Sequence, residues 1–315
     1  MKAIVIDAFG GADKLHPAEL PSPNPAAGEV LVEIAATSVN PVDWKIREGK
    51  LARMFPHHFP LIPGWDAAGT VAAVGSAVKG FHKGEKVYAY CRKPEVQWGT
   101  YAELVTVPET SVAPMPATLA FEAAAAIPLV GLTALQCLEL AGVKAGQTVL
   151  VQGGAGGVGS MGIQLARVAG ARVLTTASAK NHEYVRSLGA ELAIDYTQED
   201  VAKAVRRHVP DGVDVVLDFV GGEAQKQAYG MTRRGGKVVS IVGMPDRALA
   251  DQHGVEGGYV FVAPSGQQLR HLARLIDEGQ LKPPAVQVMP LQDAARAQDL
   301  SRAGHTRGKI VLKVK

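Results

Sequence analysis

A glycine-rich turn between a buried strand and a helix carries the clearest chemical signal in the sequence. Gly154, Gly156 and Gly159 have the G-x-G-x-x-G spacing, between the apolar run 149–152 and the helix-period run 158–169. One glycine of such a turn makes the bend, a second admits a pyrophosphate to the backbone, and a third lets the helix pack on the sheet. N–H groups at the helix N-terminus then bind the phosphate charge. The residues predicted to contact a dinucleotide here are Gly154, Gly156, Gly157, Val158 and Gly159.

The end of the next strand indicates which dinucleotide fits. NAD sites place Asp or Glu about 20 residues beyond the glycine loop, where it binds the ribose hydroxyls. Ala177 takes that position here, and Ser178 and Lys180 follow it. A serine hydroxyl and a lysine ammonium suit a 2′-phosphate, so the sequence predicts NADPH. Two alternatives stay open: Lys180 is only a solvated residue at a helix start, or Asp195 faces the sugar and weakens the preference.

Three further segments follow later apolar strands of the same region. In open parallel sheets the ligand crevice lies outside the carboxyl ends of the strands. Val220 follows the fourth strand, Val242-Gly243 the fifth, and Phe261-Val262 ends the sixth. We therefore expect the first two segments to line the nicotinamide half of the cofactor, and we count Phe261 and Val262 among the cofactor-binding residues.

The elements that must position these residues differ along the chain. Residues 1–120 contain short strands between glycines and prolines, predicted over 2–8, 29–39, 67–74, 85–90 and 102–107. Residues 121–282 alternate strands and helices, which predicts a parallel sheet covered on both faces. Residues 283–315 form an α+β segment whose last strand is expected to return to the first domain. The predicted fold class is α/β: a doubly wound parallel sheet plus a β-rich domain.

Composition excludes several function classes. The chain has 315 residues, with 33 basic and 30 acidic residues interspersed, so no basic surface for nucleic acid is predicted. Its two cysteines, Cys91 and Cys137, form no disulfide framework and suit a reducing compartment. No signal segment and no apolar run of about 20 residues is present. The expectation is a soluble cytoplasmic protein with no membrane partner.

Several runs together resemble the medium-chain dehydrogenase/reductase superfamily, and within it the zinc-free, zeta-crystallin-like quinone oxidoreductase branch. The runs that carry the resemblance are 38–49, 62–69, 99–103, 147–167, 214–222 and 306–312. The resemblance implies a GroES-like catalytic domain (1–120, completed by 283–315) and a Rossmann domain (121–282). It also implies an active cleft between the two domains, and a homodimer formed along the last strand of the Rossmann sheet.

The metal-binding positions of the zinc-dependent relatives are changed in this chain. By motif alignment Asn40 replaces the first Cys, Trp65 replaces the His, and Leu129 falls near the third ligand; the four-Cys structural lobe is missing. The pair His57-His58 is expected on a solvated loop. We therefore predict no metal site. Without a Lewis acid, acceptors that take hydride readily are favoured, namely quinones and α,β-unsaturated carbonyl compounds.

Three residues are the candidates closest to the chemistry. Asn40 would contact the nicotinamide or the substrate carbonyl, or is only a turn-former before Pro41. Asp43 would orient Asn40 or Lys45, or is an N-cap residue of a short turn. By resemblance Thr133 reaches the nicotinamide side; the alternative is a helix-interior residue.

The predicted substrate pocket contains Lys45, Trp65, Tyr90 and Leu129. Lys45 would offer charge to a quinone oxyanion, with a surface lysine as the alternative. Trp65 would stack on the quinone, or is a core residue. Tyr90 and Tyr101 are possible proton donors, although Tyr101 has a structural context. No general acid is assigned, since a reduced quinone takes protons from solvent.

Two more residues complete the cofactor prediction. By resemblance Tyr196 presses on the adenosine phosphate. The C-terminal Arg307 or Lys309 would add positive charge for the 2′-phosphate. The resulting hypothesis is an NADPH-dependent quinone or enone reductase. An enoyl-thioester reductase and a non-catalytic, crystallin-like NADPH-binding protein are the alternatives.

Overall fold

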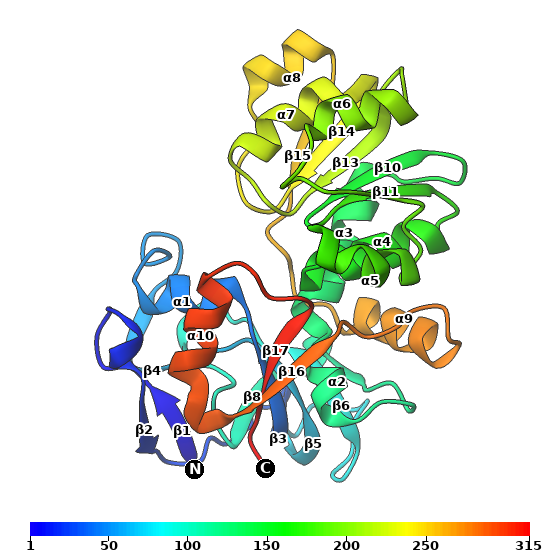
Figure 1. Ribbon diagram of the computed structural model, residues 1–315. Coiled ribbons are helices and arrows are strands. Elements are labelled where there is room, and N and C mark those ends of the chain that lie inside the picture. The colour runs from blue at the N-terminus through cyan, green and yellow to red at the C-terminus, as the bar shows by residue number, and fades with distance from the viewer. The chain divides into compact units, whose positions relative to one another are not determined.

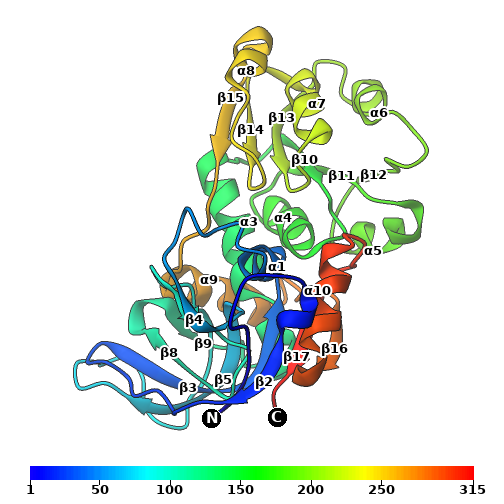
Figure 2. The ribbon, with the colours of Figure 1, turned by 90° about the vertical axis from the view of Figure 1, so that its left-hand side faces the viewer.

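The computed structural model describes residues 1–315 and divides into two compact units. The first unit comprises Met1–Leu129, Pro264–Gly279 and Pro283–Lys315, and the second comprises Val130–Ala263 and Gln280–Lys282. Figures 1 and 2 show their elements from two directions. The mixed α/β class predicted from the sequence is confirmed, with a GroES-like domain and a parallel Rossmann sheet.

The first unit is built on a seven-stranded sheet. Its order is β16-β17-β3-β5-β6-β9, and β8 pairs with β3 off this path. Two small sheets, β1-β2 and β4-β7, accompany it. The strands are β1 (Lys2–Val5), β2 (His16–Glu19), β3 (Glu29–Val39), β4 (His57–Ile62), β5 (Asp66–Val74), β6 (Lys86–Tyr90), β7 (Val96–Trp98), β8 (Leu104–Pro108), β9 (Val112–Pro114), β16 (Val286–Pro290) and β17 (Lys309–Lys313).

Short helices cover the strands of the first unit. They are α1 (Pro41–Arg47), α2 (Phe121–Ala125), α9 (Gly266–Asp277) and α10 (Ala294–Arg302), with 3₁₀ turns η1 (Ala12–Lys14), η2 (Glu109–Ser111) and η4 (Leu291–Asp293). The sequence had assigned the α9 segment to the Rossmann domain. In the structure α9 packs on β9 and η2, and the Tyr88 hydroxyl donates to the Leu269 carbonyl oxygen at 2.5 Å.

The C-terminal strand β17 pairs antiparallel with β3, so that Ile310 lies opposite Val39 and Val311 opposite Ser38. Figure 1 shows this red strand beside the blue β3. Continuing the register by one residue places Lys309, at the start of β17, opposite Asn40, where β3 ends and α1 begins. Strand β5 pairs with the other side of β3 and starts at Asp66. The sheet thus brings Asn40, Asp66 and Lys309 together from three strand ends.

The second unit is a six-stranded parallel sheet of order β12-β11-β10-β13-β14-β15. Figure 2 shows α6, α7 and α8 on one side of this sheet and α3, α4 and α5 on the other. The strands are β10 (Thr148–Gln152), β11 (Arg172–Thr176), β12 (Leu192–Ile194), β13 (Val213–Asp218), β14 (Thr232–Ser240) and β15 (Glu256–Tyr259). The helices are α3 (Pro128–Ala141), α4 (Gly157–Val168), η3 (Ala179–Asn181), α5 (His182–Ser187), α6 (Val201–His208), α7 (Glu223–Met231) and α8 (Arg247–His253).

Near-continuous apolar runs explain why this sheet forms. Val149, Leu150 and Val151 of β10 are fully buried, as are Val216 and Leu217 of β13. A strand covered by helices on both faces has no solvent face, so it needs no alternation of apolar and polar residues. The order places β10 at the centre, where the strand order reverses. In doubly wound sheets this is where the ligand crevice opens.

Several element boundaries differ from the sequence-based expectation. The strand expected at 259–262 is β15, which ends at Tyr259, so Phe261 and Val262 lie beyond it. His57 begins β4 and is hydrogen-bonded to the Phe55 carbonyl oxygen at 2.7 Å, so the solvated loop expected there is wrong. Strands β2, β4, β7 and β9 and helix α8 were not expected. These elements are short, and tertiary pairing rather than periodicity decides whether they form.

No helix combines the length and the apolar character needed to cross a membrane. The longest, α3, has 14 residues, whereas a spanning helix needs about 20.

Candidate functional site

The glycine turn of the second unit leaves no room for side chains at two of its positions. A Cβ on Gly154 would lie 2.0 Å from Thr175 Oγ1, and one on Gly159 would lie 2.2 Å from the Gly153 carbonyl oxygen. A Cβ on Gly156 would approach nothing closer than 3.5 Å. Gly154 and Gly159 are therefore glycines because the protein itself is close. Gly156, the N-cap of α4, lies beside open space, in which a ligand could contact the protein backbone.

The first turn of α4 contains Gly157, Val158 and Gly159, whose N–H groups have no intrahelical acceptor. A twelve-residue helix beginning at the carboxyl end of the central strand presents these donors, and the positive end of its dipole, to an anion. The arrangement suits a pyrophosphate. This is the chemistry that the glycine spacing predicted.

The end of β11 contains no free carboxylate. Ala177 is 2% exposed, and Lys180 is exposed on the turn that follows. Asp195 accepts hydrogen bonds from the Thr197 hydroxyl (2.7 Å), the Thr197 N–H (2.9 Å) and the Ala179 N–H (3.1 Å), and these bonds lower its pKa. Its oxygens are thus used to shape the turn that carries Ser178 and Lys180. Three of its roughly four acceptor sites are occupied in this way, so the alternative in which Asp195 binds the sugar is left with one site on Oδ2.

Exposed apolar side chains follow three strands of the parallel sheet. Tyr196 is 55% exposed after β12, Val220 52% after β13 and Val242 45% after β14. All three were predicted to contact the cofactor, and they follow strands at the carboxyl edge of the sheet, where the ligand crevice of such sheets opens. Gly243 is half-buried beside Val242, whereas Val262 and Thr133 are only 8% and 3% exposed.

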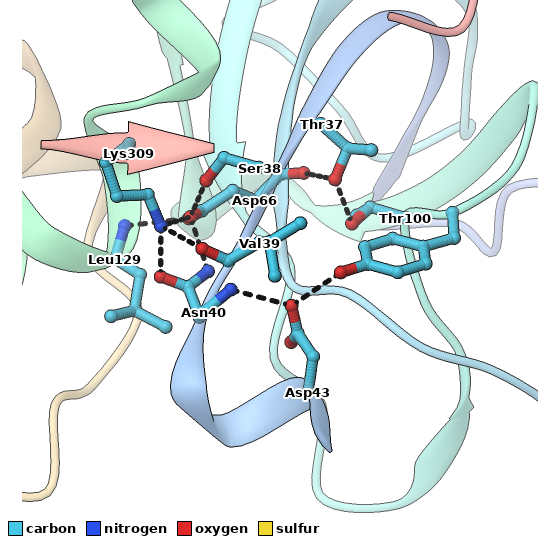
Figure 3. Close-up of polar contacts among 10 residues, drawn as sticks. Thr37, Ser38, Val39, Asn40, Asp43, Asp66, Thr100, Leu129 and Lys309 are labelled. Atoms are coloured by element: carbon cyan, nitrogen blue, oxygen red, sulfur yellow. Dashed lines mark hydrogen bonds and ion pairs between the residues drawn. The ribbon is translucent and has the colours of Figure 1, made fainter. Parts of the chain in front are cut away.

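In the first unit, Asn40 lies at the centre of a buried polar cluster, shown in Figure 3. Its Nδ2 donates to Asp66 Oδ2 at 2.8 Å, and its Oδ1 accepts a hydrogen bond from Lys309 Nζ. The two contacts fix which way the amide points, because only the oxygen accepts and only the nitrogen donates. Asn40 is more than a turn-former: its side chain is fully buried and oriented by two charged groups.

Asp66 is fully buried, and its carboxylate accepts hydrogen bonds at both oxygens. Its Oδ2 accepts hydrogen bonds from the Ser38 hydroxyl (2.7 Å) and the Asn40 amide, and its Oδ1 accepts one from the Leu129 N–H (2.7 Å). The Lys309 ammonium lies 3.8 Å from Oδ2 and also donates to the Val39 carbonyl oxygen at 2.7 Å. Burial raises the pKa of Asp66, and the Lys309 charge opposes that shift. Such a set of donors suits an ionised carboxylate.

Asp43 is the third buried charged group of this cluster. Its Oδ2 accepts the Asn40 backbone N–H at 2.8 Å and the Tyr101 hydroxyl at 2.9 Å, while its Oδ1 is buried without a hydrogen-bond partner. Burial raises the pKa of Asp43 to about 7, against the opposing effects of the two donors and of Lys309. Asp43 therefore orients Asn40 through the backbone, and Tyr101 is its partner.

The predicted substrate-pocket residues have varied surroundings. Trp65 is 4% exposed and packs edge-on against Phe55 and Tyr90, so it is a core residue in this unit. Tyr90 is fully buried, and burial raises its pKa. Leu129 contributes its backbone N–H to Asp66. Lys45 is half-buried near the Trp44 ring, and burial together with Lys50 lowers its pKa.

Lys309 was expected near the 2′-phosphate of the cofactor, and its environment differs from that expectation. Its ammonium is 4% exposed and bound to oxygens of the first unit. We therefore no longer assign it to a phosphate. The sequence reasoning also missed Asp66 and Asp218; the available signal was an acidic residue directly bordering a buried strand.

Asn40, Trp65 and Leu129 stand at or near the positions that hold the catalytic zinc ligands in the zinc-dependent relatives. The structure gathers two of these positions around Asp66, through the Asn40 side chain and the Leu129 backbone. No group of three His, Cys, Asp or Glu side chains in residues 1–315 has an arrangement that could hold a metal ion.

Two family models match the chain: the alcohol dehydrogenase GroES-like domain over residues 26–117 and the zinc-binding dehydrogenase over residues 188–312. A chloroplastic NADPH-dependent alkenal/one oxidoreductase of Arabidopsis thaliana is 38% identical, over 99% of this chain and 79% of its own length. The quinone oxidoreductase of Coxiella burnetii is 34% identical with a TM-score of 0.89, covering 100% and 99% of the two chains. The Escherichia coli quinone oxidoreductase complexed with NADPH is 28% identical, also with a TM-score of 0.89, and both chains are covered completely.

Proposed function

The chain belongs to the medium-chain dehydrogenase/reductase superfamily of oxidoreductases, and on that premise we propose that it transfers hydride from NADPH, without zinc, to a quinone or an α,β-unsaturated carbonyl compound. The observation that carries the proposal is the nucleotide surface of the second unit. It combines the α4 N-terminus, a strand end without a free acid, and three exposed apolar side chains.

Residues of the second unit would contact four parts of NADPH. The first turn of α4 would bind the pyrophosphate, and Ser178 and Lys180 would bind the 2′-phosphate. Tyr196 would cover the adenosine side, whereas Val220 and Val242 would contact the nicotinamide half. When bound, the nicotinamide supplies the hydride. The protein residues hold it and exclude water from its apolar side.

Zinc independence is supported by the chemistry of the Asn40 cluster. An amide oxygen is a poor replacement for a thiolate as a zinc ligand, and the Asn40 oxygen already accepts from the Lys309 ammonium. A divalent cation at the same oxygen would be repelled by that charge. We therefore propose that the enzyme uses acceptors that need no metal to polarise them, although one matching family model is named for zinc binding.

The proposal is tested by mixing purified protein and NADPH with quinones, alkenals, cyclic enones and an enoyl thioester, and by following NADPH absorbance. We expect turnover with at least one quinone or enone, no oxidation of simple alcohols with NADP⁺, and unchanged rates after dialysis against a zinc chelator. Absence of turnover across the panel would contradict the proposed activity. NADPH binding without turnover would point to a non-catalytic protein, and turnover with the thioester alone to an enoyl-thioester reductase.

Cofactor choice has its own test in Lys180. Lys180→Gln should weaken NADPH binding about tenfold and leave NADH binding unchanged, because one charge opposite the 2′-phosphate is lost. Lys144→Gln is the matched control, since Lys144 is also exposed but precedes the amino end of β10. Equal losses for both nucleotides would remove Lys180 from the 2′-phosphate site.

We also propose a homodimer and a cytoplasmic location. The dimer proposal is supported by β15, which is the edge strand of the parallel sheet and is paired on one side only within the chain. Two free, buried cysteines suit a reducing compartment, although the Arabidopsis relative is chloroplastic. Light scattering of the purified protein tests the dimer, and a fluorescent fusion tests the location.

A further inference from the structure

Three neighbouring strands of the second unit end in polar residues that lie side by side. Gln152 of β10 pairs in register with Asp218 of β13, which pairs with Ser240 of β14. Their exposed fractions are 3%, 0% and 0%. These strands lead into the glycine turn and into the Val220 and Val242 loops. A buried polar row therefore lies directly under the surface proposed to bind the nicotinamide half.

The Asp218 carboxylate is bonded to the loop after its own strand and to the neighbouring strand. Its Oδ1 accepts the Val220 N–H at 3.0 Å and the Gly221 N–H at 2.8 Å. Its Oδ2 accepts the Ser240 hydroxyl at 2.6 Å. The Ser240 oxygen in turn accepts the Val242 N–H at 3.2 Å and, more weakly, the Gly243 N–H at 3.4 Å. One carboxylate and one hydroxyl thus connect the two loops.

The N–H groups held in this way include those of the two exposed valines. Val220 and Val242 have side chains that are 52% and 45% exposed. The loops are also packed together: a Cβ on Gly221 would lie 2.6 Å from Val242 Cγ1, and one on Gly153 would lie 3.1 Å from Val220 Cγ2. Packing therefore supports only the buried half of each valine side chain. Their position depends on the backbone that Asp218 and Ser240 hold.

We propose that Asp218 and Ser240 form a positioning clamp that fixes the Val220 and Val242 loops for the nicotinamide half of the cofactor. The clamp rests on the proposed function, since it assigns a role within the same nucleotide site. Neither residue touches the reacting atoms. A buried carboxylate without a cation is costly unless donors satisfy it, and here the donors are the loop N–H groups themselves and the Ser240 hydroxyl.

The test compares a whole cofactor with a fragment that lacks nicotinamide. Wild type, Asp218→Asn and Ser240→Ala are titrated with NADPH by fluorescence, and with NADH and 2′,5′-ADP by calorimetry. We expect Asp218→Asn to weaken NADPH and NADH about tenfold, because an amide NH₂ cannot accept a hydrogen bond from the Ser240 hydroxyl that connects the two loops, and Ser240→Ala about threefold, because the Val242 N–H loses its acceptor. The affinity for 2′,5′-ADP should stay within about twofold of wild type, since that fragment uses only the adenosine side.

A matched control lies on the same strand. Asp214, at the other end of β13, accepts from the Thr148 N–H and the Arg233 Nε, both at 2.7 Å. Asp214→Asn removes a carboxylate of the same strand that accepts one backbone N–H and one arginine N–H, at the end away from the nucleotide surface, and we expect no change in binding of either nucleotide. Circular dichroism establishes that each variant is folded, and Ser240→Ala carries the test if Asp218→Asn does not fold.

The outcomes separate the clamp from the proposed function. Unchanged NADPH affinity in both variants, with wild type binding and reducing acceptors normally, would overturn the clamp alone. An equal loss of 2′,5′-ADP affinity would also overturn it, because the role would then be general support of the unit. A wild-type protein that binds neither nucleotide would overturn both.

Discussion

The two units each bury a carboxylate completely at the end of a strand, and they satisfy it by different means. Asp66 starts β5 in the first unit and Asp218 ends β13 in the second; both are 0% exposed. Asp66 has a hydroxyl, an amide, a backbone N–H and the nearby Lys309 ammonium. Asp218 has two backbone N–H groups and a hydroxyl, all of them neutral. One buried charge is balanced by a cation, the other by dipoles.

This difference predicts how each cluster responds to mutation. Removing one member of a buried charge pair leaves the other charge without its partner, which is strongly destabilising. Removing an acceptor from neutral donors costs only the hydrogen bonds and the desolvation of what remains. The first unit should therefore depend on charge, and the second on the geometry of its donors.

The largest effect is expected from Lys309→Met. This change leaves the Asp66 carboxylate buried beside Asn40 with no cation, so we expect a loss of about 3–5 kcal/mol in the free energy of unfolding. Denaturant unfolding measures it. Lys313→Met is the control on the same strand. Lys313 is 54% exposed, and its one ion pair, with Glu122 at 3.7 Å, is a surface pair. The change should therefore cost no more than about 0.5 kcal/mol.

A second variant tests the reason for that loss. Asp66→Asn combined with Lys309→Met removes both charges. This double variant should therefore be less destabilised than Lys309→Met alone. If Lys309→Met cost no more than the Lys313 control, the buried pair would not carry the stability of this cluster.

A pH-dependent effect of up to about 4 kcal/mol is expected from Asp43, the second buried carboxylate of the first unit, because burial raises its pKa. Its pKa is raised from 3.8 to about 7, so the folded chain binds the proton more tightly than the unfolded chain. The resulting stabilisation is full below about pH 4 and is lost as the pH rises through about 7.

The measurement is the difference in unfolding free energy between wild type and Asp43→Asn, whose amide does not titrate. That difference should fall as the pH rises over this interval and stay constant above it. The groups that act on Asp43 (Asn40, Tyr101, Lys309 and Asp66) are present in both proteins, so their own titrations largely cancel. A difference independent of pH would show that Asp43 does not hold a proton in the folded chain.

The comparison also explains what the sequence could predict. Val220 and Val242 were predicted as residues of the nucleotide site because parallel strands end on one edge, a rule that needs no knowledge of register, whereas Tyr196 was placed by resemblance. Lys309 was misplaced because its environment depends on how β17 pairs with β3, whose residues lie about 270 positions away along the chain. No turn joins these strands, so no local signal sets their register.

A smaller effect is expected from Asp218→Asn. The asparagine keeps the shape and one acceptor oxygen, but its NH₂ group cannot accept from the Ser240 hydroxyl. We expect a loss of about 1–3 kcal/mol in the free energy of unfolding, below that of Lys309→Met. Parallel denaturant curves of the two variants measure this. Equal losses would mean that a cation and a set of neutral donors are equivalent for a buried carboxylate, against the contrast drawn between the two units.

The smallest expected difference in unfolding free energy is between alanine variants of two matched serines. Here the second unit should lose more stability than the first, the reverse of the order expected for the charged residues. Ser38 donates to Asp66 at 2.7 Å and Ser240 to Asp218 at 2.6 Å, and both are fully buried. Ser38→Ala leaves Asp66 with its amide, its N–H donor and Lys309, so a loss of about 1 kcal/mol is expected.

Ser240→Ala also leaves the Val242 N–H without its acceptor, so its loss should be larger, by about 1 kcal/mol. Thermal and denaturant unfolding of the two variants measure the order. If Ser38→Ala were the more harmful change, hydroxyl donors would matter most where a cation is already present, and the dipole-based account of Asp218 would have to be abandoned.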